Sequence, residues 1–128
     1  MEKQVLFSAR TQAYLETIRE IAKQLPGTEE YLCFGTPAFR TKKRLIARLQ
    51  EDGNTLSVYA ADRDIWINQY PEMFFVTPHF YNYPAVLLKL SVIPTRLLRQ
   101  VITEAWQQTA PKSMLKQHPD HKGSVKLS

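Results

Sequence analysis

Apolar side chains recur every three or four residues near both ends of the chain, which is the spacing of one face of an α-helix. The first such segment, Ser8–Gln24, is expected to be a helix that Ser8 caps and that Pro26-Gly27 ends. The second begins at Pro94 and continues to Pro111. Two amphipathic helices therefore flank the centre of the chain.

Between these helices, short runs of β-forming residues alternate with turn residues, which predicts a three-stranded meander. Within Arg44–Gln50, the alternation predicts that Leu45, Ala47 and Leu49 face the core. Ile46 is expected on the outer face with the polar side chains. The predicted strands are Glu30–Phe34, which resumes after a break as Ala38–Thr41, then Arg44–Gln50 and Thr55–Ala60, with turns at Lys42-Lys43 and Glu51–Asn54.

A short helix, two apolar strands and an aromatic loop are expected before the last helix. Their predicted bounds are Asp62–Tyr70 for the helix, Met73–Val76 and Val86–Val92 for the strands, and Thr77–Pro84 for the loop. The last strand is almost continuously apolar, which indicates burial on both faces. Trp66 and Trp106 both occupy core-like helical positions. The order of elements predicts an α+β fold, a two-layer sandwich whose N- and C-terminal helices cover one face of a mainly antiparallel sheet.

Length and composition agree with one folded domain. The chain has 128 residues, of which 44% are hydrophobic, and its single Cys excludes an internal disulfide framework. No apolar run approaches the roughly 20 residues that span a bilayer, and the N-terminus lacks the apolar block of a secretory signal. We therefore expect a cytoplasmic protein without membrane association, with one domain over residues 1–115 and a flexible basic tail over 116–128.

The formal net charge of +5 is concentrated in one short segment. Five of the 17 basic residues and none of the 12 acidic residues lie between Thr36 and Gln50. Such local charge attracts the phosphate backbone of nucleic acids, although cations on an exposed strand also prevent edge-to-edge aggregation. The candidate phosphate-binding residues are Arg40, Lys42, Lys43, Arg44 and Arg48, and a second basic stretch in the tail contains Lys112, Lys116, Lys122 and Lys126.

The aromatic loop places flat side chains after this basic segment. His79, Tyr81 and Tyr83 alternate between Pro78 and Pro84, and in an extended segment they would project to one side. Rings beside a cationic strand could stack on bases, as in proteins that bind single strands. The alternative is that the rings cover the edge of the sheet and keep their hydroxyl groups in water.

Little in the sequence is typical of an enzyme. The four Gly residues form no phosphate-binding motif, and His118 and His121 lack the further ligands of a metal site, so no cofactor or metal is expected. Cys33 could act as a nucleophile with His79 as its base. Because Cys33 lies in an apolar strand, the alternative is a buried structural Cys. We therefore expect no catalysis.

Several short blocks of sequence follow one another in a specific order. The blocks are LPGTEE at 25–30, FGTPAF at 34–39, LIARL at 45–49, FFVTPHF at 74–80, YP at 83–84, VLLKL at 86–90, AW at 105–106 and APK at 110–112. In this order they resemble the MmcQ/YjbR family over about residues 8–115. The resemblance implies a compact α+β domain with a "double wing" arrangement, related to the frataxin-like CyaY fold. Family members are generally labelled as DNA-binding, and no catalytic residues are implied.

Two functional hypotheses result. In the first, the chain is a non-enzymatic DNA-binding protein whose basic segment contacts phosphates, with His79, Tyr81 and Tyr83 as secondary contacts to sugars or bases. In the second, it is a protein- or small-ligand-binding module that uses the aromatic loop, residues 78–84, and has no nucleic-acid role. A shared surface for the cations and the rings favours the first hypothesis, and separate surfaces favour the second.

Overall fold

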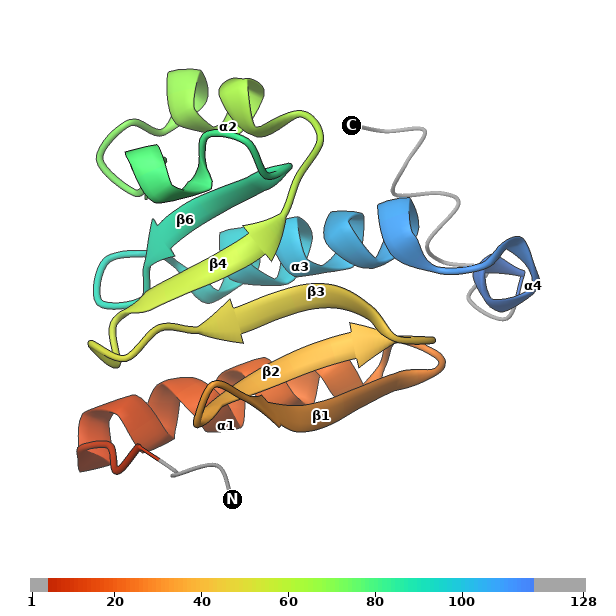
Figure 1. Cartoon of the computed structure of the whole chain (residues 1–128), viewed down its shortest axis with the longest axis horizontal. Helices are drawn as coiled ribbons and strands as arrows, with labels where there is room; N and C mark the ends of the chain where they lie inside the picture. Colours follow the sequence, from red (N-terminus) through yellow and green to blue (C-terminus); the bar gives the residue numbers. More distant parts are fainter. Residues whose placement is uncertain (1–4, 117–128) are drawn as a thin grey trace.

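Both long helices form where the apolar spacing predicts them. The computed structural model describes residues 5–116 and places α1 at Ala9–Lys23 and α3 at Thr95–Thr109. The hydroxyl oxygen of Ser8 accepts a hydrogen bond from the backbone N–H of Thr11 at 3.2 Å, so Ser8 caps α1 as expected. Helices α1 and α3 lie behind the sheet in Figure 1 and cover one of its faces.

One six-stranded sheet forms the second layer (Figure 1). The strands are β1 (Thr28–Cys33), β2 (Thr36–Thr41), β3 (Arg44–Leu49), β4 (Thr55–Tyr59), β5 (Phe74–Phe75) and β6 (Ala85–Lys89). Each neighbouring pair is antiparallel, and the order across the sheet is β1-β2-β3-β4-β6-β5. The expected α+β fold is therefore confirmed. The shorter helices are α2 (Arg63–Gln69), the 3-10 helix η1 (Pro78–Phe80) and α4 (Lys112–Leu115).

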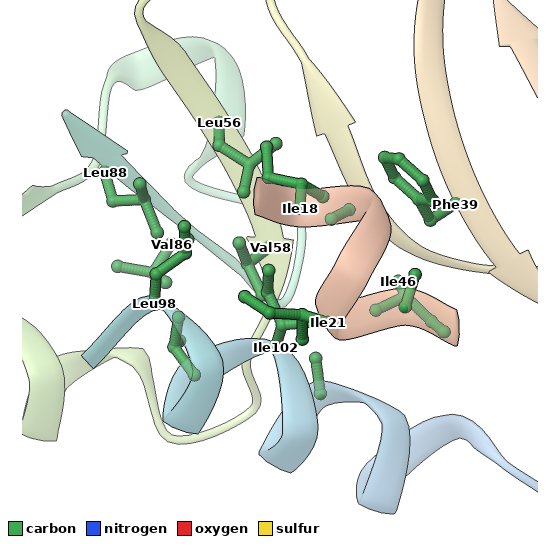
Figure 2. Close-up of a cluster of buried hydrophobic side chains, with 14 of the residues drawn as sticks. Ile18, Ile21, Phe39, Ile46, Leu56, Val58, Val86, Leu88, Leu98 and Ile102 are labelled. Carbon is green, nitrogen blue, oxygen red and sulfur yellow. The ribbon is translucent and has the colours of Figure 1, made fainter. Parts of the chain in front are cut away.

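The core fills the space between the sheet and the two long helices (Figure 2). Its side chains come from α1, α3 and the helix-facing side of the sheet, among them Ile18, Ile21, Phe39, Ile46, Leu56, Val58, Val86, Leu88, Leu98 and Ile102. Trp66 and Trp106 are both buried, as predicted. The indole N–H of Trp106 donates a hydrogen bond to the carbonyl oxygen of Pro26 at 2.9 Å, which joins α3 to the end of the α1–β1 connection.

The first strand pair differs from the prediction. Phe34-Gly35 is a two-residue hairpin turn that joins β1 to β2, with Cys33 paired to Thr36, and not a break within one strand. Both turn residues have positive φ, 53° for Phe34 and 83° for Gly35, as in a type I′ turn. The meander β1–β4 consequently has four strands, and β1 forms the edge of the sheet.

The predicted facing of residues in β3 is partly wrong. Ile46 is fully buried, whereas Leu45 is 41% exposed. The pairing of β2 with β3 shifts between Phe39 and Arg40, which leaves one extra residue on β3. A bulge of this kind breaks the alternation of faces, so that Ile46 and Ala47 both contribute to the core.

The described chain ends just after α4, which lies within the predicted domain 1–115. Met114 and Leu115 of this helix are partly buried and pack against the core. Lys122, Lys126 and the two candidate His residues of the tail lie outside the described residues. Within residues 5–116, no helix is long and apolar enough to cross a membrane.

Candidate functional site

A groove of about 460 Å³ lies on the face of the sheet that α1 and α3 leave open. Strands β3 and β4 pair at three positions, from Ala47–Val58 to Leu49–Leu56, and diverge beyond them (Figure 1). The bulge in β3 bends the strand at this point. Thr109 of α3 lines the groove where the two strands separate. The groove therefore results from the same irregularity that buries Ile46.

Polar side chains that are hydrogen-bonded to one another form the floor of the groove. The Arg48 Nε–H donates to the carbonyl oxygen of Cys33 at 2.9 Å, and Arg48 Nη2 lies 3.2 Å from Glu51 Oε2. The Gln50 amide donates to Ser57 Oγ at 3.1 Å. Because these side chains are hydrogen-bonded to one another, their positions are fixed. The floor therefore presents an amide, a hydroxyl group and a guanidinium in a defined arrangement.

Aromatic rings form the two walls. Phe34, at the tip of the β1–β2 hairpin, is 77% exposed, and the guanidinium of Arg48 lies 5.4 Å from the centre of its ring. The opposite wall consists of His79, Phe80 and Tyr83. The ring centres of His79 and Phe80 are 5.0 Å apart, and that of Tyr83 lies 6.3 Å from each. The groove thus has a single exposed ring on one side and a cluster of rings on the other.

The aromatic loop is not extended as predicted. Pro78–Phe80 forms a 3-10 turn, which brings His79, Phe80 and Tyr83 together and leaves Tyr81 outside the lining of the groove. Alternation along an extended strand fails here because a 3-10 helix turns the chain once every three residues. Of the three predicted aromatic contacts, His79 and Tyr83 share the groove and Tyr81 does not.

Arg63, which the sequence analysis did not single out, holds this loop in place. Its Nη1 donates to the carbonyl oxygens of Phe80, Tyr83 and Ala85 at 2.9, 2.6 and 3.2 Å. Its Nη2 donates to the carbonyl oxygen of Tyr81 at 2.8 Å. One guanidinium at the first position of α2 therefore fixes the backbone that carries the ring cluster.

The five predicted cations differ in how far other groups neutralise them. Arg40 lies 2.7 Å from Glu29 and 4.0 Å above the ring of Tyr31, and Arg48 pairs with Glu51. Among the described residues, Lys42, Lys43 and Arg44 are exposed and form no ion pair. The three cations that remain available to a ligand are therefore consecutive in sequence and lie at the β2–β3 turn.

This turn has a conformation that Lys residues rarely adopt. Thr41 pairs with Arg44, so Lys42 and Lys43 form a two-residue loop. Their φ angles are 52° and 70°, as in a type I′ turn, which strongly favours Asn-Gly. A side chain with a Cβ in this left-handed region costs roughly 1–2 kcal/mol per residue. With Lys at both positions, the turn is therefore less stable than it would be with Asn-Gly.

Cys33 is half-buried, so the prediction of a buried Cys is wrong. Cys33 and His79 both line the groove, but no hydrogen bond joins them within the described residues. Burial, reinforced by the neighbouring Cys33, raises the pKa of Tyr31, and the charges of Arg40 and Arg48 oppose this change. No group of three or more His, Cys, Asp and Glu side chains positioned to hold a metal ion occurs in residues 5–116.

Comparison with known proteins identifies the family. A family model described as YjbR matches residues 23–108, which include the sheet and most of α3. The chain belongs to the YjbR family. It is 40% identical over 90 residues to the uncharacterized protein Rv2570 of Mycobacterium tuberculosis and to the uncharacterized protein Mb2600 of Mycobacterium bovis, covering 66% of this chain and 70% of each relative. No solved structure shows a significant match to this YjbR-family chain.

Several residues of the groove were not found from the sequence. The β-forming run Glu30–Phe34 places Phe34 at the end of a strand, although Phe-Gly between two strands is compatible with a hairpin tip. Leu45 was expected in the core, and Gln50 and Ser57 are polar residues without a distinctive motif. Among the described residues, the hydrogen bonds of Arg63 all go to backbone carbonyl groups, which every residue type possesses, so no sequence pattern marks its role.

Proposed function

We propose that this YjbR-family protein is a non-enzymatic nucleic-acid-binding protein that uses the open face of its sheet. The observation that carries the proposal is a shared surface, because Arg44 and Arg48 line the same groove as His79 and Tyr83. Among the described residues, no Asp or Glu lines this groove. Because Glu51 pairs with Arg48, the unpaired positive charge in the groove comes from Arg44 among the described residues, and this charge suits an anionic ligand.

The β2–β3 turn supplies the phosphate contacts in this proposal. Lys42, Lys43 and Arg44 are exposed and unpaired within the described residues, whereas Arg40 and Arg48 already have carboxylate partners. If three cations each neutralise one phosphate of duplex DNA, the logarithm of affinity should fall with the logarithm of salt concentration with a slope of about −3. Phosphate contacts of this kind position a protein without reading sequence.

The strained turn provides a sharp test. In the variant Lys42→Asn/Lys43→Gly, the turn acquires its preferred residues and loses two charges. We expect binding to a random DNA duplex at low salt to weaken, and the salt slope to fall from about −3 to about −1. The free energy of unfolding should rise by about 1 kcal/mol, because the relief of strain exceeds the added flexibility that Gly gives the unfolded chain.

The control variant is Lys42→Arg/Lys43→Arg, which keeps both charges and the strained backbone. It should bind DNA with nearly unchanged affinity and salt slope. Because the Asn-Gly variant is expected to be more stable than wild type, weaker binding cannot result from unfolding. If its DNA affinity equals that of wild type, the β2–β3 turn is not the phosphate-binding surface and the proposal is wrong.

The size of the groove favours a second candidate function. A volume of about 460 Å³ lies within the range of roughly 300–1,000 Å³ typical of ligand pockets. The chain would then be a protein- or small-ligand-binding module that uses the aromatic loop. Tyr83→Leu should abolish capture of such a ligand, whereas Tyr81→Leu, outside the lining, and the Asn-Gly turn variant should leave it intact.

Two further expectations concern the topology of the fold and the location of the protein. The resemblance to the double-wing, CyaY-like fold remains an expectation about the topology of this family. A cytoplasmic location is proposed because the chain has a single Cys and a net charge of +5, which suit a reducing compartment that contains nucleic acid.

A further inference from the structure

We infer that the groove holds an unpaired base, so that the ligand is single-stranded nucleic acid and Phe34 is the residue on which the base stacks. This inference rests on the proposed function and makes it more specific. Phosphate contacts at the β2–β3 turn would be the same for single and double strands. The groove distinguishes them, because a base within a duplex is already stacked and cannot enter it.

Phe34 lies at a position where a large apolar ring is unfavourable for the fold. Phe34 is 77% exposed at a hairpin tip, with φ at 53°, and a bulky side chain at positive φ is a genuine outlier. Asn or Gly would fit this backbone better and would avoid exposing an apolar ring to water. Neither local backbone preference nor core packing therefore explains a Phe at this position, whereas a stacking platform for a base does.

The aromatic loop adds further rings to the groove. His79, Phe80 and Tyr83 face the groove from a loop that Arg63 fixes through four backbone carbonyls. Phe34 and this ring cluster both line the groove, so a strand that follows the groove can place different bases on them. Aromatic rings accept any base because every base has a π-face. Stacking of this kind gives affinity for single strands without strong sequence preference.

The polar and charged side chains of the groove also suit a nucleotide. Gln50 and Ser57 place an amide and a hydroxyl group beneath the ligand, which suits the polar edge of a base. Arg44 lines the groove and directly follows the turn lysines, so one ligand can reach both.

The test compares three ligands of equal length by fluorescence anisotropy at low salt. The ligands are a single-stranded oligothymidylate of about 12 nucleotides, within the about 4–16 nucleotides of single-strand sites, a DNA duplex, and a strand of abasic sites that keeps the phosphates and lacks bases. Wild type is expected to bind the oligothymidylate most tightly. The variants are Phe34→Asn, which suits positive φ, and Phe34→Tyr, which keeps a ring.

We expect Phe34→Asn to weaken oligothymidylate binding by about 5- to 140-fold, the loss of one base–aromatic stack, and to leave the abasic strand unaffected. Phe34→Tyr should bind all three ligands nearly as wild type does. Phe34→Asn should melt at the same temperature as wild type or higher, because Asn tolerates positive φ. A loss of binding with an unchanged or higher melting temperature therefore reports on the ring and not on folding.

Two other outcomes separate this inference from the proposed function. If wild type binds the abasic strand and the duplex as tightly as the oligothymidylate, and Phe34→Asn changes nothing, the inference about the base is overturned while phosphate binding stands. If none of the three ligands binds at low salt, both are overturned, and a protein or small molecule becomes the occupant of the groove.

Discussion

Arg63 joins α2 to the aromatic loop, and its loss should alter the groove more than any other single change outside the groove lining. The perturbation we choose is Arg63→Met, which keeps an unbranched apolar stem and removes the guanidinium. Four backbone carbonyls then lose their donor, those of Phe80, Tyr81, Tyr83 and Ala85. The expected result is a protein that folds normally except at the wall formed by the ring cluster.

The geometry sets the size of the effect. A hydrogen bond from a charged donor contributes about 1.5–3 kcal/mol. The contacts to Tyr81 and Tyr83 are exposed, so water can replace them, whereas those to Phe80 and Ala85 are partly buried. Counting the two partly buried bonds at the lower limit gives a loss of about 3 kcal/mol in the free energy of unfolding. Arg63→Lys should lose less, because an ammonium still has three donors but cannot span four carbonyls.

Urea unfolding measures the global effect, and hydrogen exchange of the loop amides measures the local one. The amides of Tyr81 and Tyr83 bond to the carbonyl oxygens of Pro78 and Phe80, and should exchange faster in Arg63→Met. Arg96→Met on α3 is the matched control, because Arg96 is exposed and forms no ion pair among the described residues. Unchanged stability together with unchanged exchange in Arg63→Met would refute the role we assign to the guanidinium.

Two carboxylates should affect stability in opposite directions as pH changes. Burial tends to raise the pKa of Asp52, but hydrogen bonds from the Thr55 hydroxyl and from the amides of Asn54 and Thr55 outweigh it and hold the pKa below its ordinary 3.8. The contribution of Asp52 to the free energy of unfolding should therefore be complete above about pH 4, and it should be lost as pH falls through the lowered pKa. Asp52→Asn should make the free energy of unfolding, measured with urea at neutral and acidic pH, less sensitive to acid. Burial raises the pKa of Glu104 above its ordinary 4.5, with a smaller contribution from Asp62 and an opposing hydrogen bond from Gln100. The contribution of Glu104 to the free energy of unfolding is complete below about pH 4 and is lost as pH rises through its raised pKa. Glu104→Gln should therefore increase the free energy of unfolding at neutral pH and leave it unchanged in acid. An equal gain at both pH values would contradict this explanation.

The long helices and most strands were predictable because each buries one face of a regular element. The apolar spacing gives α1 and α3 one apolar face each, and each helix buries that face against the sheet. The register of β3 was not predictable, since Leu45 and Ile46 are both apolar and hydrophobicity fits either facing. The bulge that selects Ile46 arises from pairing with β2, which is a long-range property.

The candidate site was predictable in its charges and not in its shape. A run of cations is visible in any sequence, and Lys42, Lys43 and Arg44 are indeed exposed. The groove depends on the divergence of β3 and β4, on a hairpin tip at Phe34 and on the four carbonyl contacts of Arg63. Only the hairpin tip has a local signal, which is the Gly that follows Phe34. The divergence of the strands and the contacts of Arg63 depend on backbone groups that are the same in every residue.

The two turns that flank β2 are both strained. Phe34, Lys42 and Lys43 all have positive φ, all three are exposed, and they occupy the two turns that flank β2. Because their side chains contribute nothing to the core, Asn or Gly at these positions should stabilise the fold. The identity of these residues is therefore better explained by a ligand than by folding, and a ring at one turn and two cations at the other match the bases and phosphates of one strand. We expect the Asn-Gly variant and Phe34→Asn both to gain stability and to lose affinity for single-stranded DNA. This result would mean that the residues at these turns favour binding at the expense of stability.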